Sequence, residues 1–505
     1  MFNFGGKSKI KPIKATVRTI TVPTEKKPPP RPSAIQAQKR HSDTRSPASA
    51  RNSPSTARSS PATTSGDDSR LKVPKHKGHS RPRSPAEQRI RWGEDDSEEE
   101  GNGSTDYEGP SRKKQKLARP VDSKRQLQQE KAYSKKGGRV FDMIHAADIP
   151  IGKKKSKIAE QVAENLTVEF QYPSSSQRER YALIIRKDEI NPPEEFLEIA
   201  KIVTEVYLTP EQAEEFNEPN QGIIRQLEKT KNIWLRDARN AESLEKFKLA
   251  VDKYNKSLSR LIDGGAITNN LGARHDLPLH MVLRILQQVY DRAVSPYVDT
   301  LKQYENGTDN VYGELLGKFI SEALINTGLK SDQVFVDLGS GVGNVVLQAA
   351  LQFGCESWGC EMMDNACDLA ESQEKEFNAR CRLWGIKPGD VHLERGDFLE
   401  NQAIQEAMKR ADVILVNNQA FTPDLNHKLI QLFLDLKDGC KIVSLRSFVP
   451  DGHEISDRNL YDPVNLLEVK KLEYFSGSVS WTDIGGDYFL ATKDEKRVKK
   501  WMDQE

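Results

Sequence analysis

The sequence predicts an α/β protein with a Rossmann-like sheet in its last third, a mostly helical region before that sheet, and a disordered basic arm at the N-terminus. Three observations support this fold class. Apolar strands alternate with helices from residue 333 onward, which is typical of a parallel sheet covered on both faces. The preceding region carries apolar stripes of helical period, and the first 160 residues hold few large apolar side chains. The expected domains are residues 1–160, 161–310 and 311–505.

The N-terminal arm is basic and the rest of the chain is acidic. Residues 1–140 contain 32 Lys and Arg against 15 Asp and Glu, whereas residues 141–505 contain 44 against 59. Burial of the few apolar residues in the arm cannot offset the entropy of ordering it. One basic cluster suits a solvated surface or an import signal as well as an anionic partner, but several in one arm favour contact with DNA or an acidic protein surface. These clusters are Arg112, Lys113, Lys114 and Lys116, and Lys153, Lys154, Lys155 and Lys157.

The cysteines, the apolar runs and the first residues of the chain exclude several classes of protein. The five cysteines form no CxxC pair and have no His cluster beside them, so we expect buried reduced thiols and no metal site. No apolar run approaches the roughly 20 residues of a membrane span. The start, "MFNFGGKSKIK", lacks the apolar core of a signal peptide. We therefore expect a soluble protein of the cytosol or nucleus with no membrane partner.

Upstream of the sheet, the sequence predicts one strand and then helices. "LTVEFQYP" alternates like a strand, and residues 242–263 carry a 3-4 apolar stripe that stops at two glycines. "LHMVLRILQQVYDRAV" predicts another helix, and a third is expected to begin near Glu314. We interpret these stripes as core-facing surfaces.

The stretch "VFVDLGSGVGN" predicts a strand, a tight glycine turn and the start of a helix. Gly339, Gly341 and Gly343 give the spacing G-x-G-x-G, with Asp337 just before the turn. This is neither the dinucleotide pattern G-x-G-x-x-G nor a phosphate-binding loop, which needs Gly-Lys-Ser/Thr. Close backbone approach without a phosphate suits S-adenosyl-L-methionine. Taken alone, the turn also fits a structural role or another nucleotide.

Polar side chains at the ends of the next three strands narrow the ligand. Glu361 is placed to accept from both hydroxyls of a ribose, Asp397 to accept from an adenine amino group, and Phe398 to stack on the ring. Asn417, after the fourth strand, can orient a substrate nitrogen. Each has a plainer interpretation as a solvated carboxylate, a turn residue or a core residue. In this order at successive strand ends, they predict an S-adenosylmethionine-dependent methyltransferase.

Two other classes stay open. Enzymes that methylate a nucleobase amine often carry Asn/Asp-Pro-Pro-aromatic at the fourth strand, whereas Asn418 and Gln419 follow Asn417 here. A nucleic-acid amine methyltransferase is therefore disfavoured but remains an alternative. The second alternative is a non-catalytic chromatin-binding scaffold. The acids and glycines expected to bind the cofactor are intact, which argues against this alternative.

Several motifs together resemble the disruptor-of-telomeric-silencing family, the histone lysine methyltransferases that lack a SET domain. They are "VYGEL", "VFVDLGSGVGN", "GCE", "ERGDFL", "VNNQAFTPDLN" and "GSVSWT…YFL", and the resemblance covers about residues 165–495. A basic arm before a C-terminal catalytic domain is similar to the fungal members. The resemblance implies a nuclear chromatin regulator that methylates a lysine in the folded core of histone H3 within nucleosomes and acts in telomeric silencing. Its expected partners are the histones and DNA of the nucleosome, and we expect a monomer.

The resemblance also implies roles for individual residues. The loop over the methionine end of the cofactor would be Tyr312, Gly313, Glu314 and Leu315. The cradle would be Phe335, Val336, Asp337, Leu338, Gly339, Ser340, Gly341, Val342, Gly343 and Asn344, with Glu361, Asp397 and Phe398 beyond it. Asn417, Tyr488 and Tyr312 would be catalytic, and Phe421 and Trp481 would line the lysine channel. Leu315 departs from members with a hydroxyl residue there, and Gln419 from members with an aromatic residue.

The expected reaction is in-line attack of a neutral lysine amine on a sulfonium methyl group. Free lysine has a pKa of about 10.4, so only about one in 2,500 is neutral at pH 7. A narrow apolar channel and a nearby cation both lower the pKa of such an amine. We find no obvious strong general base, so deprotonation of this kind followed by orientation is the expected mechanism.

Overall fold

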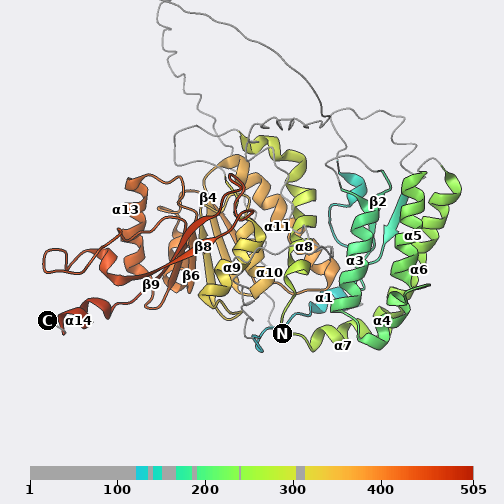
Figure 1. The fold of residues 1–505 in the computed structure, drawn as a ribbon, viewed down its shortest axis with the longest axis horizontal. Helices are drawn as coiled ribbons and strands as arrows, with labels where there is room; N and C mark the ends of the chain where they lie inside the picture. Colours follow the sequence, from blue (N-terminus) through green and yellow to red (C-terminus); the bar gives the residue numbers. More distant parts are fainter. Residues whose placement is uncertain are drawn as a thin grey trace, which may run out of the picture. The chain divides into compact units, whose positions relative to one another are not determined.

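The structure is a computed structural model that describes residues 121–134, 140–149, 166–184, 190–237, 240–302 and 313–503. Tyr312, both basic clusters and the first 120 residues of the predicted arm lie outside the described residues. Figure 1 shows the fold, with the strands and helices of the sheet in yellow to red. Within the described ranges, no helix is both long and apolar enough to span a bilayer. The five cysteines are free and buried.

A seven-stranded sheet forms the centre of the second half of the chain. Its strand order is β5-β4-β3-β6-β7-β9-β8; the first five strands are parallel, and β9 runs antiparallel to both β7 and β8. The chain moves outward from β3 to β5 and then returns to the other side of β3 with β6. Ligands bind at such a switch point, beyond the carboxyl ends of the strands. The strands are β3 (Val334–Leu338), β4 (Glu356–Glu361), β5 (Val391–Arg395), β6 (Val413–Val416), β7 (Lys441–Ser444), β8 (Leu467–Tyr474) and β9 (Gly486–Lys493).

Helices cover both faces of this sheet, which is why β3 and β6 are apolar at nearly every position. Phe335 packs with Leu347 on one face, whereas Val336 and Leu338 pack with Ile404 on the other. The first face carries α9 (Gly317–Thr327), α10 (Asn344–Phe353) and α11 (Asp364–Trp384), and the second carries α12 (Gln402–Arg410) and α13 (Pro423–Leu432). Short elements complete this half: η5 (Phe433–Asp435), η6 (Pro463–Leu466) and α14 (Arg497–Met502).

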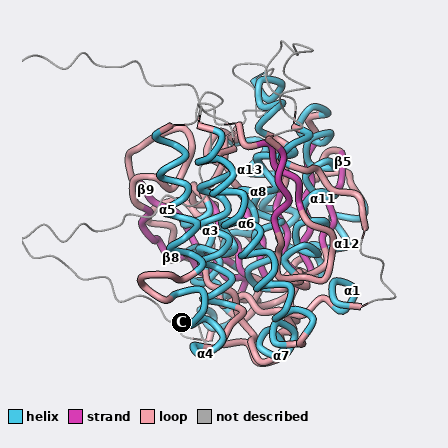
Figure 2. Tube along the Cα trace, turned by 90° about the vertical axis from the view of Figure 1, so that its right-hand side faces the viewer, coloured by secondary structure: helices cyan, strands magenta, loops and turns pink. Residues whose placement is uncertain are grey.

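The preceding region is helical, as predicted, with one β-hairpin. The predicted helix over residues 242–263 is α6, which ends at Asp263 and is followed by Gly265 at φ 75°. Helices α3, α5 and α6 lie side by side (Figures 1 and 2). The elements are β1 (Thr167–Phe170), β2 (Glu179–Ala182), α3 (Pro192–Val206), α4 (Pro210–Asn217), α5 (Ile223–Arg236), α6 (Ala241–Asp263), α7 (Ala266–Gly272), α8 (Leu279–Ala293) and η4 (Ser295–Lys302).

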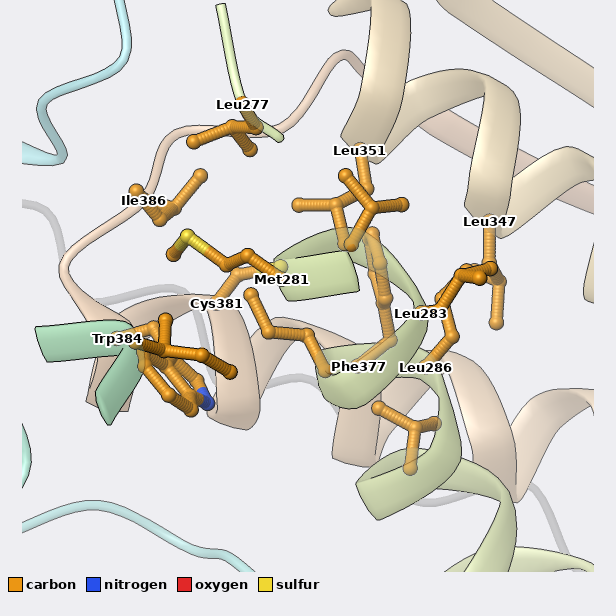
Figure 3. Close-up of a cluster of buried hydrophobic side chains, with 14 of the residues drawn as sticks. Leu277, Met281, Leu283, Leu286, Leu347, Leu351, Phe377, Cys381, Trp384 and Ile386 are labelled. Carbon is orange, nitrogen blue, oxygen red and sulfur yellow. The ribbon is translucent and has the colours of Figure 1, made fainter. Parts of the chain in front are cut away.

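Helix α8 joins the helical region to the sheet. Figure 3 shows Met281 and Leu286 in a buried cluster with Leu351 of α10 and Phe377 of α11. This apolar contact lies on the face of the sheet that α10 and α11 cover. The helical region is therefore packed against the two helices that follow the first two strands of the sheet.

A buried ion-pair network joins the same elements. Glu179 of β2 accepts hydrogen bonds from Arg292 of α8 (2.7 Å) and Arg380 of α11 (2.9 Å), and all three side chains are fully buried. Burial alone would raise the pKa of Glu179, but the two guanidinium groups outweigh it and lower that pKa to about 2. Glu179 thus links the β1–β2 hairpin to α8 and α11.

Two boundaries differ from the sequence-based expectation. The predicted arm of residues 1–160 ends too late, because residues 121–134, with α1 (Glu130–Tyr133), pack against the fold, and Leu127 is 1% exposed. Residues 140–149 contain η3 (Ala146–Asp148), whose first backbone N–H, that of Ala146, donates to Glu179. The helix expected near Glu314 begins at Gly317, because the backbone of residues 314–316 pairs with residues 478–480 instead.

Candidate active site

A cavity of about 380 Å³ lies where the carboxyl ends of β3, β4, β5 and β6 meet. It brings together most of the residues that the sequence singled out, although they are spread over more than a hundred positions. The predicted residues on its lining are Gly313, Glu314, Leu315, Asp337, Gly339, Ser340, Gly341, Val342, Asn344, Glu361, Asp397, Phe398, Asn417 and Phe421.

The glycine turn has a backbone that only glycine adopts easily. Gly339, Gly341 and Gly343 have φ values of 85°, 55° and 89°, in the left-handed region. The backbone N–H groups of Gly339 and Ser340 both donate to the carbonyl of Cys360 in β4, at 3.0 Å. The turn is therefore tied to the neighbouring strand, and its backbone faces the cavity without side chains in the way.

Asp337 is the buried acid of the site. Its side chain is 2% exposed, and it lines the cavity at the end of β3. Burial, helped by the negative charge of Glu361, raises the pKa of Asp337 to about 8. With no ligand bound, this carboxyl group is therefore mostly protonated at neutral pH.

Glu361 organises the site as well as lining it. One carboxylate oxygen accepts from the backbone N–H of Gly341 at 2.9 Å, and the other accepts from those of Met362 and Met363 at 2.8 Å each. The side chain thus joins the glycine turn to the segment that leads into α11. The oxygen that faces Gly341 accepts one of these bonds and has two lone pairs, so a hydroxyl group of a ligand can still donate to it.

The side of the cavity expected to hold adenine is built by the turn after β5. One oxygen of Asp397 accepts from the backbone N–H of Leu399 at 2.8 Å, which fixes the orientation of the carboxylate. Phe398 stacks with Phe421, which follows β6, with ring centroids 6.4 Å apart and an interplanar angle of 25°. A carboxylate beside two aromatic rings offers both a hydrogen-bond acceptor and flat apolar surface to a purine.

Asn417 is held against the segment that closes the cavity. Its amide nitrogen donates to the carbonyl of Gly313 at 3.2 Å, whereas its amide oxygen is buried and finds no hydrogen-bond partner among the described residues. The pairing with Gly313 therefore occupies the amide nitrogen and leaves the buried oxygen unpaired in the described part of the chain.

Residues 313–316 are pinned from the other side by the loop between β8 and β9. The hydroxyl oxygen of Ser480 accepts from the backbone N–H of Glu314, and the backbone N–H of Ser480 donates to the carbonyl of Glu314, both at 2.9 Å. A Cβ atom on Gly313 would lie 2.8 Å from the Trp481 ring, so this glycine allows the indole to approach. Trp481 thus supports the cavity through Gly313 and is not placed on its lining.

Four residues of the predicted cofactor cradle do not reach the lining of this cavity. Phe335, Val336 and Leu338 are fully buried in the sheet, each against helices of one face, and they do not reach the cavity lining. Gly343 is the N-cap of α10 and lies outside the lining too; a Cβ atom there would be 3.0 Å from Leu393. These residues set the position of the turn and do not form the surface that faces a ligand.

Tyr488, the expected wall of the lysine channel, lies in the core of this structure, and its part in such a channel stays a prediction. Its side chain is 1% exposed, stacks edge-on against Phe319 and accepts a hydrogen bond from Asn326 of α9 at 2.7 Å. It is not on the cavity lining. The alternation of side chains along β9 directs this residue to the core beneath α9.

Some lining residues were not among the predicted site residues, although Cys360, Leu399 and Leu425 lie within quoted motifs. Met362 and Met363 directly follow Glu361, so their position in the chain could have suggested them. Leu301 comes from η4 in the helical region, and no motif marks it. The others are Val345, Cys360, Asn365, Ala366, Leu399, Leu415 and Leu425, all next to a predicted strand end, turn or helix start.

Comparisons with known proteins identify the family of this sequence. The sequence profile of the family "Histone methylation protein DOT1" matches residues 290–493. Three proteins named "Histone-lysine N-methyltransferase, H3 lysine-79 specific" are similar over three quarters or more of their length. The one from Aspergillus fumigatus is 50% identical over 84% of this chain and 83% of its own, and the one from Emericella nidulans is 52% identical over 76% of each. The one from Gibberella zeae is 48% identical over 85% of this chain and 86% of its own.

Solved structures give a more distant match. An RNA methyltransferase from Salinibacter ruber, in complex with S-adenosyl-L-homocysteine, aligns with 35% of this chain and 92% of its own at 21% identity. The TM-score is 0.24, at which the alignment carries no argument about function.

Proposed function

This chain belongs to the DOT1 family of histone methylation proteins, and on that basis we propose that it methylates lysine 79 of histone H3. One observation carries the proposal: identity of 48–52% extends over three quarters or more of relatives that all bear this activity in their names. The enzyme is a histone-lysine N-methyltransferase, and S-adenosyl-L-methionine is its methyl donor.

The residues on the cavity lining fit that donor. A Cβ-free turn at Gly339 and Gly341 permits close approach, and Glu361 and Asp397 offer acceptors at two strand ends. The buried Asp337 can balance a cationic ligand once it has lost its proton. When bound, S-adenosyl-L-methionine supplies an electrophilic methyl group on a sulfonium centre. Tyr312, for which we also propose a contact to it, lies outside the described residues.

The chain's own residues orient the amine that receives the methyl group. The orphaned oxygen of Asn417 accepts one N–H of the lysine amine, so that the nitrogen lone pair has a defined direction. Leu315, Leu415 and Phe421 line the same cavity and are apolar. A lysine that enters loses hydration there, its pKa falls, and the neutral amine that the reaction needs becomes accessible.

The protein is proposed to act on nucleosomes in the nucleus as a monomer. Support comes from the net charge of the N-terminal 140 residues, which suits the phosphate backbone of DNA. The contacts proposed there are Lys113, Lys114, Lys116, Lys153, Lys154 and Lys155. They set affinity for the substrate and take no part in the chemistry. A role in telomeric silencing is part of the same proposal.

The function is tested by methyl transfer from radiolabelled S-adenosyl-L-methionine to nucleosomes, free histones, DNA and RNA offered in parallel. Label is expected on histone H3, and most strongly when H3 is in nucleosomes. Gly341→Arg should abolish transfer, because residue 341 needs φ 55° and the arginine side chain would fill the cavity. If only DNA or RNA were labelled, the proposal would be wrong and the chain would be a nucleic-acid amine methyltransferase. Absence of label together with calorimetric binding of S-adenosyl-L-methionine would contradict the proposed substrates.

A further inference from the structure

Residues 121–134, here called the N-terminal strap, lie at the edge of the sheet opposite the cavity. The carboxylate of Asp122 accepts from the N–H and hydroxyl of Ser331, in the turn before β3, at 2.8 and 2.7 Å. The carbonyl of Leu127 accepts from the N–H of Lys387, in the turn between α11 and β5, at 2.7 Å. Both turns precede parallel strands, so they lie at the amino ends of those strands, whereas the cavity lies at the carboxyl ends.

The strap places a guanidinium group on the C-terminal end of α10. Arg125 is 2% exposed and donates to the carbonyls of Leu351 and Gln352. Carbonyls in the last turn of a helix have no donor within the helix, and a cation there is favourable with the helix dipole. A Cβ atom on Gly354 would lie 2.9 Å from the Arg125 side chain, so the glycine leaves space for it.

The same strap covers the C-terminal end of α11. Gly385 ends that helix with φ 72°, and its carbonyl accepts from the N–H of Gln129 at 3.0 Å. A Cβ atom on Gly385 would lie 2.0 Å from the hydroxyl of Tyr133, which shows how closely the tyrosine packs on this residue. The strap therefore holds the ends of two helices at once.

The other ends of these two helices begin at the cavity. Helix α10 starts at Asn344, directly after the glycine turn, and α11 starts at Asp364, three residues after Glu361. A ten-residue helix is a rigid rod of about 15 Å, so a shift of its C-terminal end moves its N-terminal end as well. Residues at the far edge of the sheet can thus set the geometry of the cofactor site.

We propose that Arg125 is a positioning residue for cofactor binding: by fixing the C-terminal end of α10, it fixes the glycine turn at the other end. This role rests on the proposed function, since the ligand of that turn is S-adenosyl-L-methionine. The strap is thus a working part of the catalytic unit, although it lies within the segment whose composition predicts a disordered arm.

The test is calorimetric titration of S-adenosyl-L-methionine into the full chain and its variants. Arg125→Ala is expected to weaken binding by about tenfold or more, because small displacements of a preorganised site have effects of that size. Arg125→Lys should recover part of the affinity, since it keeps the charge but has one donor nitrogen in place of the two that reach Leu351 and Gln352. Lys124→Ala is the matched control: its side chain is 73% exposed and pairs with Asp332 in solvent, so binding should be unchanged.

A role in fold stability alone gives a different result. The folded fraction of Arg125→Ala would then bind with the wild-type Kd, only the number of binding sites would fall, and the KM for S-adenosyl-L-methionine would not change. That result would overturn the inference. If Arg125→Ala does not fold, Arg125→Lys decides: a wild-type Kd contradicts the proposal, and a weakened one supports it.

Amide hydrogen exchange gives a second measurement. Loss of protection in Arg125→Ala should concentrate in α10 and the glycine turn, with α6 unchanged. Uniform loss over the chain would contradict the positioning role. Failure of the wild-type protein to bind S-adenosyl-L-methionine would instead contradict the proposed function, so the two failures are distinguishable.

Discussion

The proton on Asp337 makes cofactor binding depend on pH. Its folded-state pKa of about 8 lies above the ordinary value of 3.8, so the free protein carries this proton at neutral pH. A cationic ligand in the cavity favours the ionised carboxylate. Binding below pH 8 should therefore release a proton, and affinity should rise as the pH increases from about 6 to 8.

Calorimetry in buffers of different ionisation enthalpy measures the number of protons released. Asp337→Asn is the control, because the amide keeps the shape of the side chain but cannot lose a proton. Equal proton release by the wild type and this variant would show that another group is responsible.

Single residues also show where sequence reasoning succeeded. Asp337, Glu361, Asp397 and Asn417 stand at strand ends, and the carboxyl ends of parallel strands meet at one edge, so their convergence was predictable. The burial of Tyr488 beneath α9 was not. Its direction depends on the pairing of β9 with β7 and β8, and no local pattern fixes that register.

Among the contacts between elements, mutations in the ion-pair network of Glu179, Arg292 and Arg380 should lower the stability of the fold most. Removing the partner of a fully buried charge costs roughly 3–5 kcal/mol. Arg292→Ala, which removes one of the two guanidinium groups paired with Glu179, should lower the free energy of unfolding by about that amount in chemical denaturation. Arg260→Ala is the control, because its pair with Glu215 is exposed and should cost roughly 1 kcal/mol or less.

The same network predicts the direction of acid sensitivity. The pKa of Glu179 is lowered from 4.5 to about 2, so its stabilising contribution is complete above pH 4.5 and is lost as the pH falls from 4.5 toward 2. Arg292→Ala should flatten the pH dependence of stability in that range. An unchanged slope would mean that Glu179 does not carry it.

Element types were more predictable than element boundaries. The alternation of apolar strands and helices anticipated β3 to β7, and the stripe with its two glycines anticipated α6 closely. The start of α9 was wrong by three residues, because residues 314–316 pair with a loop more than 160 positions away. This long-range pairing prevents residues 314–316 from joining the helix. It also holds Glu314 and Leu315 on the lining of the cavity.

For the whole molecule, the boundary of the arm changes how its role is tested. Deleting residues 1–160 would also remove the strap and so confound nucleosome binding with cofactor binding. Deleting residues 1–120 should leave binding of S-adenosyl-L-methionine intact and weaken nucleosome binding in a salt-dependent way. Deleting residues 1–134 should weaken cofactor binding too.

Fluorescence titration of nucleosomes at several salt concentrations measures the first effect, and calorimetry measures the second. If deletion of residues 1–120 leaves nucleosome affinity unchanged at low and moderate salt, those residues have no part in binding. If the two deletions bind cofactor equally, the strap has no part in the site.

The central claim is that this cavity delivers a methyl group to one lysine of histone H3. Mass spectrometry of histones from nucleosomes incubated with the enzyme and S-adenosyl-L-methionine tests it most directly. The wild type should add methyl groups to lysine 79 of H3, and Gly341→Arg should add none. Methylation of a different residue, or of lysine 79 by Gly341→Arg at the wild-type rate, would contradict it.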